Sequence, residues 1–235
     1  MENTLLQILL IPAIGGLLCI ILSRIKYLAE AIALITSGIV IWLSIQLNLL
    51  GNLTLELSRF SWGVFNFACI FYSKPFNAFL IFFVALFGLL TVLYSFGYMD
   101  RRKSSGVYYG LVLWAVASTI GFLVSADLLF ILIFWEIVSI LLFLLASYGR
   151  EEHLGEALGK TFAMLGFSDL ALFVAMFVSV TLLCRTQGPC LITEMSVPLS
   201  GVASLIPFTL LVTSCFVKAA IFPFHSWVPS LAPVA

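Results

Sequence analysis

Residues 128–147 read LLFILIFWEIVSILLFLLAS, and this stretch decides the fold class. A helix that crosses the hydrocarbon core of a bilayer needs about 20 mostly apolar residues. The stretch has that length, and Glu136 is the one ionisable residue in it. The whole chain of 235 residues is similar, with 63% hydrophobic and 9% charged residues. It is therefore predicted to be an all-α integral membrane protein, because helices satisfy their own backbone hydrogen bonds inside lipid.

The same composition excludes several other classes of protein. Ordinary soluble domains contain about 25% charged residues, and disordered chains are polar and highly charged. The 11 basic residues balance 11 acidic ones, so there is no basic excess for binding nucleic acid. Five scattered cysteines in a chain of this length do not indicate a disulfide-rich secreted domain either.

Apolar windows of spanning length predict about seven transmembrane helices in a single domain, residues 1–235. The predicted spans lie near Thr4–Leu22, Leu28–Leu50, Phe76–Tyr98, Val107–Val124, Leu128–Ser147, Thr161–Leu183 and Val202–Phe222. Lysine and arginine are more frequent in the loops after the odd-numbered spans, which favours an N-terminus on the outer side. The loop 51–75 then lies outside. Its partly alternating residues predict a short β-hairpin, with an irregular amphipathic loop as the alternative.

Four ionisable residues in these spans or directly beside them are candidates for function. Such residues are costly in lipid, usually face the protein interior and mark ion or proton pathways. Glu136 is the strongest candidate, with a purely structural carboxylate as its alternative. Lys160 lies near the start of its span and could instead extend to the interface. At 100° per residue, Lys160 and Asp169 point to opposite faces, so Asp169 needs a partner on another helix.

The fourth candidate is Lys218, near the end of the seventh span. Pro223 has no N–H, so it is expected to break the helix and to free the carbonyl of Ala219. An amine beside such a break could exchange a proton, or it could extend to the nearby interface. His225 follows, and a histidine titrates near neutral pH. It could equally be an interfacial residue beside Trp227.

The sequence offers no metal or cofactor chemistry that we can identify. It has no CxxC motif, no iron–sulfur spacing of cysteines and no histidine pair with metal-ligand spacing. It also has no glycine-rich phosphate-binding loop. We therefore expect no metal site, no bound cofactor and no catalytic redox reaction in this chain.

Three segments resemble motifs of one protein family. The segment FWE at 134–136 resembles the signature of the family's fifth helix. The segment YSFGYM at 94–99 resembles the end of its third helix. The segment VKAAIFPFHSWVP at 217–229 resembles the motif of its seventh helix. The family is that of the antiporter-like, proton-translocating membrane subunits. It includes subunits of respiratory complex I (NADH–quinone oxidoreductase), of energy-converting membrane-bound hydrogenases and of Mrp sodium/proton antiporters. The resemblance runs from about Phe76 to Pro229 and implies the first part, the N-terminal half, of the family fold.

The resemblance also implies roles for individual residues. Glu136 would be the fifth-helix glutamate and Lys218 the seventh-helix lysine of a pair whose making and breaking gates proton movement. Asp169 corresponds to an acidic residue of the sixth helix, where the family often has Gly-Asp rather than Ser168-Asp169. His225 matches the motif histidine. Family members have a second, inverted half, so the chain would be a fragment or a shortened subunit.

By this resemblance, the chain would be a proton- or sodium-translocating subunit of a membrane redox complex of the complex I or hydrogenase type. The alternatives are a subunit of an Mrp-type cation/proton antiporter and a shortened, purely structural subunit. Its partners would be other membrane subunits, including further antiporter-like ones, and peripheral redox subunits that carry iron–sulfur clusters. The expected location is a bacterial or archaeal cell membrane, with an organelle inner membrane as the alternative.

Overall fold

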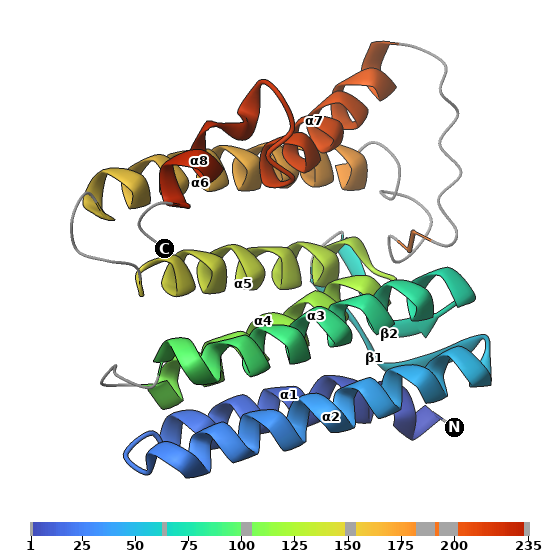
Figure 1. Cartoon of the computed structure of the whole chain (residues 1–235). Helices are drawn as coiled ribbons and strands as arrows, with labels where there is room; N and C mark the ends of the chain where they lie inside the picture. The colour runs from blue at the N-terminus through green and yellow to red at the C-terminus, as the bar shows by residue number, and fades with distance from the viewer. Residues whose placement is uncertain are drawn as a thin grey trace. The chain divides into compact units, whose positions relative to one another are not determined.

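The computed structural model describes residues 2–62, 65–99, 105–148, 154–181, 191–192 and 202–232, and most of them are helical (Figure 1). The longer helices are α1 (Glu2–Ile21), α2 (Lys26–Leu50), α3 (Pro75–Met99), α4 (Ser105–Val124), α5 (Leu128–Ala146), α6 (Leu154–Ser179) and α7 (Val202–Lys218). A 3-10 turn, η2 (Phe224–Ser226), and a short helix, α8 (Trp227–Leu231), follow. Helices α1 to α6 are long and apolar enough to cross a membrane. The predicted all-α membrane fold is therefore confirmed.

Five of the helices lie within two residues of the predicted spans at each end, and two, α6 and α7, differ by four residues or more. Helix α6 begins at Leu154, about two turns before the expected Thr161. The reason is an ion pair one turn apart, Glu156 with Lys160 at 3.1 Å, which lets polar sequence continue the helix. Helix α7 ends at Lys218 instead of Phe222, and its apolar part is shorter than a full span.

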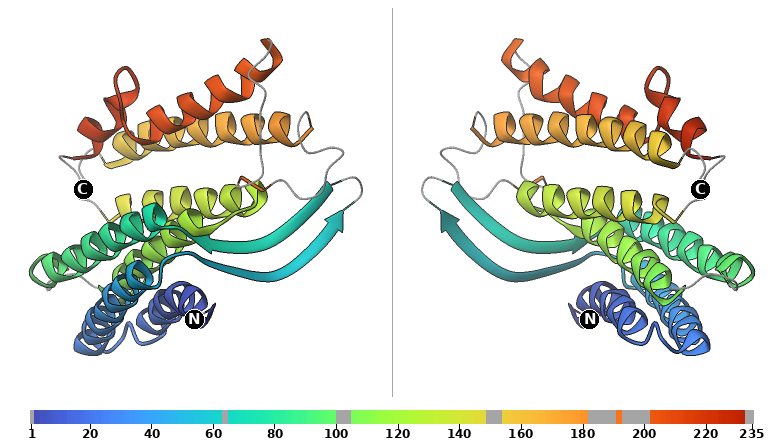
Figure 2. Two further views of the ribbon diagram at one scale, coloured as in Figure 1. Left: turned by 90° about the vertical axis from the view of Figure 1, so that its right-hand side faces the viewer. Right: turned by 90° about the vertical axis from the view of Figure 1, so that its left-hand side faces the viewer.

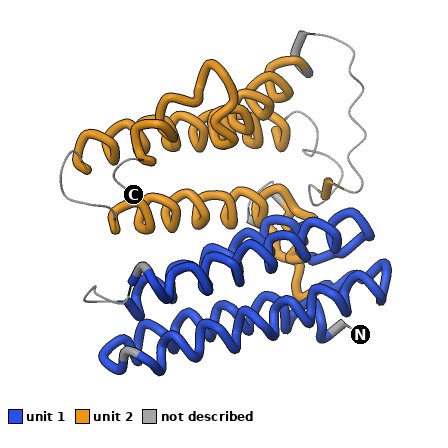
Figure 3. The backbone as a smooth tube through the Cα atoms, in the orientation of Figure 1, with its two compact units in different colours: residues 1–56, 70–125 blue, residues 57–69, 126–235 orange. Residues whose placement is uncertain are grey.

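The chain, predicted as one domain, divides into two compact units (Figure 3). The first unit comprises residues 1–56 and 70–125, and the second comprises residues 57–69 and 126–235. The loop 51–75 forms the predicted hairpin from β1 (Leu53–Trp62) and β2 (Phe65–Ser73), which run side by side as a bent ribbon (Figure 2). Its outer part belongs to the second unit and its base to the first.

In the first unit, α1 and α4 approach each other closely through small residues. A Cβ on Gly110 would lie 2.8 Å from the carbonyl oxygen of Gly16, and a Cβ on Gly106 would lie 2.5 Å from the Cα of Ser23. Gly106 and Gly110 form the small-xxx-small pattern that lets helices pack backbone to backbone in membranes. The Trp114 indole also donates to the carbonyl of α1 residue 13 at 2.9 Å.

In the second unit, α6 packs against α5, α7 and α8. The segment after α7 folds back, and the buried Trp227 indole donates to the Val217 carbonyl at 3.1 Å. The rings of Phe224 and Phe167 stack with their centroids 6.3 Å apart. These contacts hold the C-terminal end of α7 against α6, which positions Lys218.

The start of α5 is fixed by a buried carboxylate. Asp127 caps the helix by accepting from the backbone N–H of Leu129 at 2.9 Å. Its other oxygen accepts from the N–H of Ala68 in β2, also at 2.9 Å. The side chain is fully buried, so both bonds replace contacts with water. This cap sets the register of α5 and hence the position of Glu136 along it.

Candidate functional site

Helices α5, α6 and α7 bring four polar or aromatic side chains together, which we call the polar cluster: Trp135, Ser139, Asp169 and Lys218. The Oδ1 atom of Asp169 accepts from the Trp135 indole and from the Ser139 hydroxyl, each at 2.9 Å. The same oxygen lies 3.5 Å from Nζ of Lys218, and the two charged side chains are only 15% and 14% exposed. The expectation that Asp169 has its partner on another helix is confirmed.

Lys218 is held from several sides. Its Nζ donates to the Ser139 hydroxyl and, at 3.2 Å, to the backbone carbonyl of Trp135. It also lies 4.0 Å from the centre of the Trp135 ring, where a cation interacts favourably with the π-electrons. Lys218 is the last residue of α7, and a cation is stabilised by the dipole at that end of a helix. The ammonium group therefore has a stable position without reaching the membrane surface.

The end of α7 is set by Ala220, before the expected break at Pro223. Ala220 has a φ of 52°, in the left-handed region. Its N–H bonds to the Val217 carbonyl at 3.1 Å, and the next N–H, of residue 221, bonds to the carbonyl of residue 216 at 2.9 Å. This pattern is the Schellman motif, which ends helices. The helix thus stops at the lysine itself, because the chain turns before the proline.

Glu136 lies beside the polar cluster rather than within it. It is half-buried on α5, and it interacts electrostatically with Asp169 and Lys218. In the described part of the chain it makes no hydrogen bond or ion pair. The resemblance implied a pair between Glu136 and Lys218, whereas here the carboxylate that contacts the lysine is that of Asp169.

A cleft of about 410 Å³ connects the two carboxylates. Its walls come from α5 and α6, and its lining residues are Glu136, Ser139, Ile140, Phe143, Phe162, Leu165, Gly166 and Asp169. Most of the wall is apolar, so the two carboxylates and the Ser139 hydroxyl are the groups that can bind a proton, a cation or water. The volume is large enough for several water molecules.

A second contact between α6 and α7 lies next to Asp169. The hydroxyl of Ser168 donates to the Ser214 carbonyl at 2.9 Å and lies 3.1 Å from the Ser214 hydroxyl. Both side chains are fully buried. Because Ser168 precedes Asp169 directly, this contact fixes the distance between the helices that carry Asp169 and Lys218.

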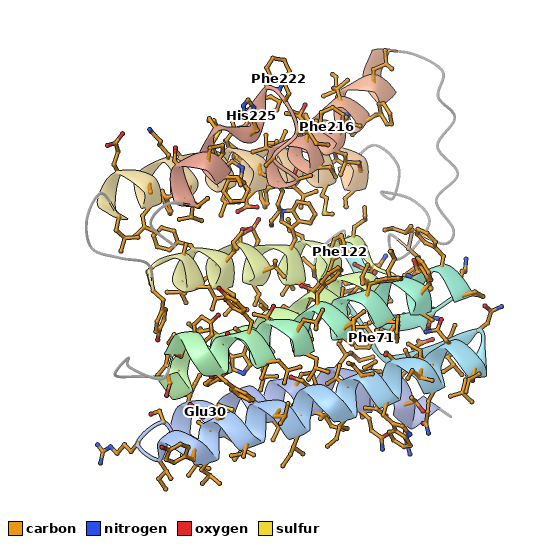
Figure 4. All side chains as sticks on the ribbon, in the orientation of Figure 1. Glu30, Phe71, Phe122, Phe216, Phe222 and His225 are labelled. Atoms are coloured by element: carbon orange, nitrogen blue, oxygen red, sulfur yellow. The ribbon has the colours of Figure 1, made fainter. Side chains whose placement is uncertain are left out.

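The remaining predicted site residues lie elsewhere. Lys160 pairs with Glu156 on the surface, with side chains 53% and 70% exposed. His225 is exposed in the segment after α7, and its ring lies 5.7 Å from that of Phe222 (Figure 4). Pro223 lies in the turn between α7 and η2. Over the residues that the structure describes, none of these three contacts the polar cluster.

Sequence reasoning missed two members of the polar cluster. Trp135 was noticed only as part of the FWE motif, and Ser139 was not singled out. The available signal was their spacing, because residues four apart share one face of a helix. Among the described residues, no group of three or more His, Cys, Asp or Glu side chains is arranged to hold a metal ion.

Several known proteins are similar to this chain. The family model described as "NADH:quinone oxidoreductase/Mrp antiporter, TM" matches residues 125–235, which include the whole polar cluster. A protein of Rhizobium meliloti, described as a probable subunit of a K⁺/H⁺ antiporter, is 25% identical over 97% of this chain and 23% of its own length. A protein of Staphylococcus aureus, described as a subunit of a Na⁺/H⁺ antiporter, is 28% identical over 60% of this chain and 18% of its own length.

Solved structures share the fold. A chain of the archaeal membrane-bound sulfane sulfur reductase superposes with a TM-score of 0.85 at 16% identity, over 100% of this chain and 48% of that one. A chain of respiratory complex I from Thermus thermophilus superposes with a TM-score of 0.80 at 22% identity, over 97% of this chain and 46% of that one. A chain of the Mrp complex from Dietzia sp. superposes with a TM-score of 0.80 at 17% identity, over 99% of this chain and 44% of that one.

The comparisons confirm the resemblance: the chain is similar in sequence to antiporter subunits and shares the fold of membrane chains of complex I and of an Mrp complex. It is a multi-pass membrane protein, and the predicted cell-membrane location agrees with these bacterial and archaeal relatives. The chain spans less than a quarter of the length of the two curated relatives and less than half of each matching solved chain.

Proposed function

We propose that the chain is an ion-translocating, antiporter-like subunit of a membrane complex and that it transfers protons or sodium ions. The observation that supports this is the ion pair of Asp169 with Lys218, which lies inside a membrane protein and opens on a cleft with a second carboxylate, Glu136. Burying two charges costs more free energy than most ion pairs return. Charged residues at this depth usually serve ion or proton pathways.

The geometry suggests how the charges would work. At about 4 Å, a charge pair is worth roughly 4 kcal/mol at an effective dielectric constant of 20. The interaction of Lys218 with Asp169 would be made in one state of the complex. In another state, Lys218 would move towards Glu136, leaving Asp169 as a carboxylate in the cleft that can take up a proton or a cation.

Two energy sources fit this role. The first is a membrane redox complex of the complex I or hydrogenase type, with iron–sulfur clusters in peripheral partner subunits. The second is an Mrp-type antiporter driven by an ion gradient, which the names of the curated relatives favour. In both cases the partners would include other membrane subunits. Iron well above background in the complex purified in mild detergent would support the first source, and background iron the second.

The proposal predicts that Glu136→Gln abolishes translocation. Glutamine has nearly the same shape but carries no charge and takes up no proton. The initial rate of proton uptake would be measured in membrane vesicles that contain the intact complex, at equal amounts of assembled complex. Glu156→Gln is the matched control, because Glu156 is 70% exposed and its ion pair lies on the surface. Translocation at the full rate by Glu136→Gln would contradict the proposal and would leave a structural role.

A further inference from the structure

We propose that the Ser139 hydroxyl relays a proton between Lys218 and Asp169. This inference rests on the proposed function and assigns a step within it. Nζ of Lys218 donates to the Ser139 hydroxyl, which in turn donates to Oδ1 of Asp169 at 2.9 Å. The direct distance from Nζ to that oxygen is 3.5 Å. That exceeds the usual 2.7–3.2 Å of an N–H···O bond, so the path through the hydroxyl has the better geometry.

A serine hydroxyl suits this position chemically. It has one hydrogen to donate and lone pairs that accept, so it can receive a proton on one side while it releases one on the other. In the step, an N–H bond of Lys218 breaks and an O–H bond forms on Ser139. At the same time the original O–H bond of Ser139 breaks and an O–H bond forms on Asp169. A charged pair becomes a neutral amine and a neutral acid, and no other reactant is needed.

The same hydroxyl has a second acceptor. Its oxygen lies 3.2 Å from the backbone carbonyl of Trp135, one turn earlier in α5. A hydroxyl has a single hydrogen, so it donates either to Asp169 or to this carbonyl. Donation to Asp169 completes the path from Lys218, and donation to the carbonyl interrupts it. Rotation about one C–O bond therefore opens or closes the relay without moving a helix.

The surroundings of Ser139 direct the transferred proton towards the cleft. The residue is 5% exposed, so little water competes for its hydroxyl. It nevertheless lines the cleft that holds Glu136 and Asp169. Glu136 and Ser139 are three residues apart and share one face of α5. A proton delivered to Asp169 therefore arrives at the cleft in which Glu136 is the next acceptor.

The test uses substitutions that separate the hydroxyl from the shape of the side chain. Ser139→Ala removes the hydroxyl, and Ser139→Thr retains it. Ser139→Val has nearly the shape of the threonine variant but has no hydroxyl. The initial rate of proton uptake is measured in vesicles with the intact complex, per assembled complex. Ser179→Ala is the matched control, because Ser179 is a buried serine of α6 whose hydroxyl bonds to the Ala175 carbonyl of its own helix.

We expect Ser139→Ala and Ser139→Val to lower the rate by about 100-fold or more, the range of lost general acid–base catalysis. Ser139→Thr and the control should stay close to the original rate, since both keep the hydroxyl path. If the alanine variant does not assemble, the threonine and valine variants decide. Equal rates in those two variants, high or low, would overturn the relay. The Glu136→Gln variant then tests the proposed function separately from the relay. If that variant loses proton uptake, the proposed function stands even though the relay is wrong. If it takes up protons at the original rate, the proposed function is wrong as well.

Discussion

At the residue scale, the charge distribution depends on which carboxylate holds Lys218. Asp169 does so here through one oxygen that also accepts from Trp135 and Ser139. Two of its three bonds come from neutral donors, so the carboxylate keeps partners even if the lysine moves away. Glu136, by contrast, lies along the wall of the cleft. In the proposed function, Asp169 would therefore be the resting partner of the lysine, and Glu136 the residue open to exchange.

The sequence identified these charges but not their partners. An ionisable residue in an apolar helix is a strong signal, so Glu136, Asp169 and Lys218 could be selected directly. Lys160 carries the same signal, and in the structure it forms an exposed ion pair with Glu156; its role in ion transfer stays a prediction. Which carboxylate contacts Lys218 depends on the packing between helices, which a single sequence does not show.

A further residue-scale prediction concerns Ala220. It is the one described non-glycine residue with a positive φ. In this conformation an alanine costs about 1 kcal/mol more than a glycine. Ala220→Gly should therefore raise the melting temperature of the purified complex. Ala219→Gly is the control and should lower it slightly, because the neighbouring position gains nothing from glycine and becomes more flexible when unfolded. Equal effects of the two changes would show that the turn is not strained.

At the element scale, hydropathy located the helices but not all of their ends. Helix α5 agrees to within one residue of the prediction, since an apolar run and the capping Asp127 coincide. Helix α6 extends further than predicted because charged residues can pair along its surface. Helix α7 ends early, at Lys218, because Ala220 adopts the left-handed conformation that ends the helix. Glycine is the usual residue in that position. The sequence pattern therefore had no marker for the point that positions Lys218.

The contact of α1 with α4 gives an element-scale prediction. Gly110→Ala would place a Cβ 2.5 Å from the Ile20 side chain and 2.8 Å from a backbone oxygen. The helices must then separate, at a cost of about 1–3 kcal/mol for overpacking. The measurement is the melting temperature of the purified complex. Gly97→Ala in α3 is the control, because its Cβ would meet no atom within 4 Å. A Gly110→Ala variant as stable as that control would disprove the close contact.

At the scale of the whole molecule, the polar cluster lies entirely in the second compact unit. That unit also includes all but the first of the residues that match the family model, 125–235. The first unit is a helix bundle in which α1 and α4 pack closely through small residues. This chain covers less than half of each of the three solved chains described above. The sequence motifs that carry the resemblance contain two of the four residues of the polar cluster, Trp135 and Lys218.

The most direct test of the central claim is the initial rate of proton uptake by vesicles that contain the complex with Asp169→Asn. Asparagine keeps an oxygen for Trp135 and Ser139 but loses the charge that faces Lys218. We expect the rate to fall by about 100-fold or more at unchanged assembly, as for the loss of an acid–base group. Uptake at the original rate in assembled complex would contradict the claim that the ion pair of Asp169 with Lys218 carries translocation.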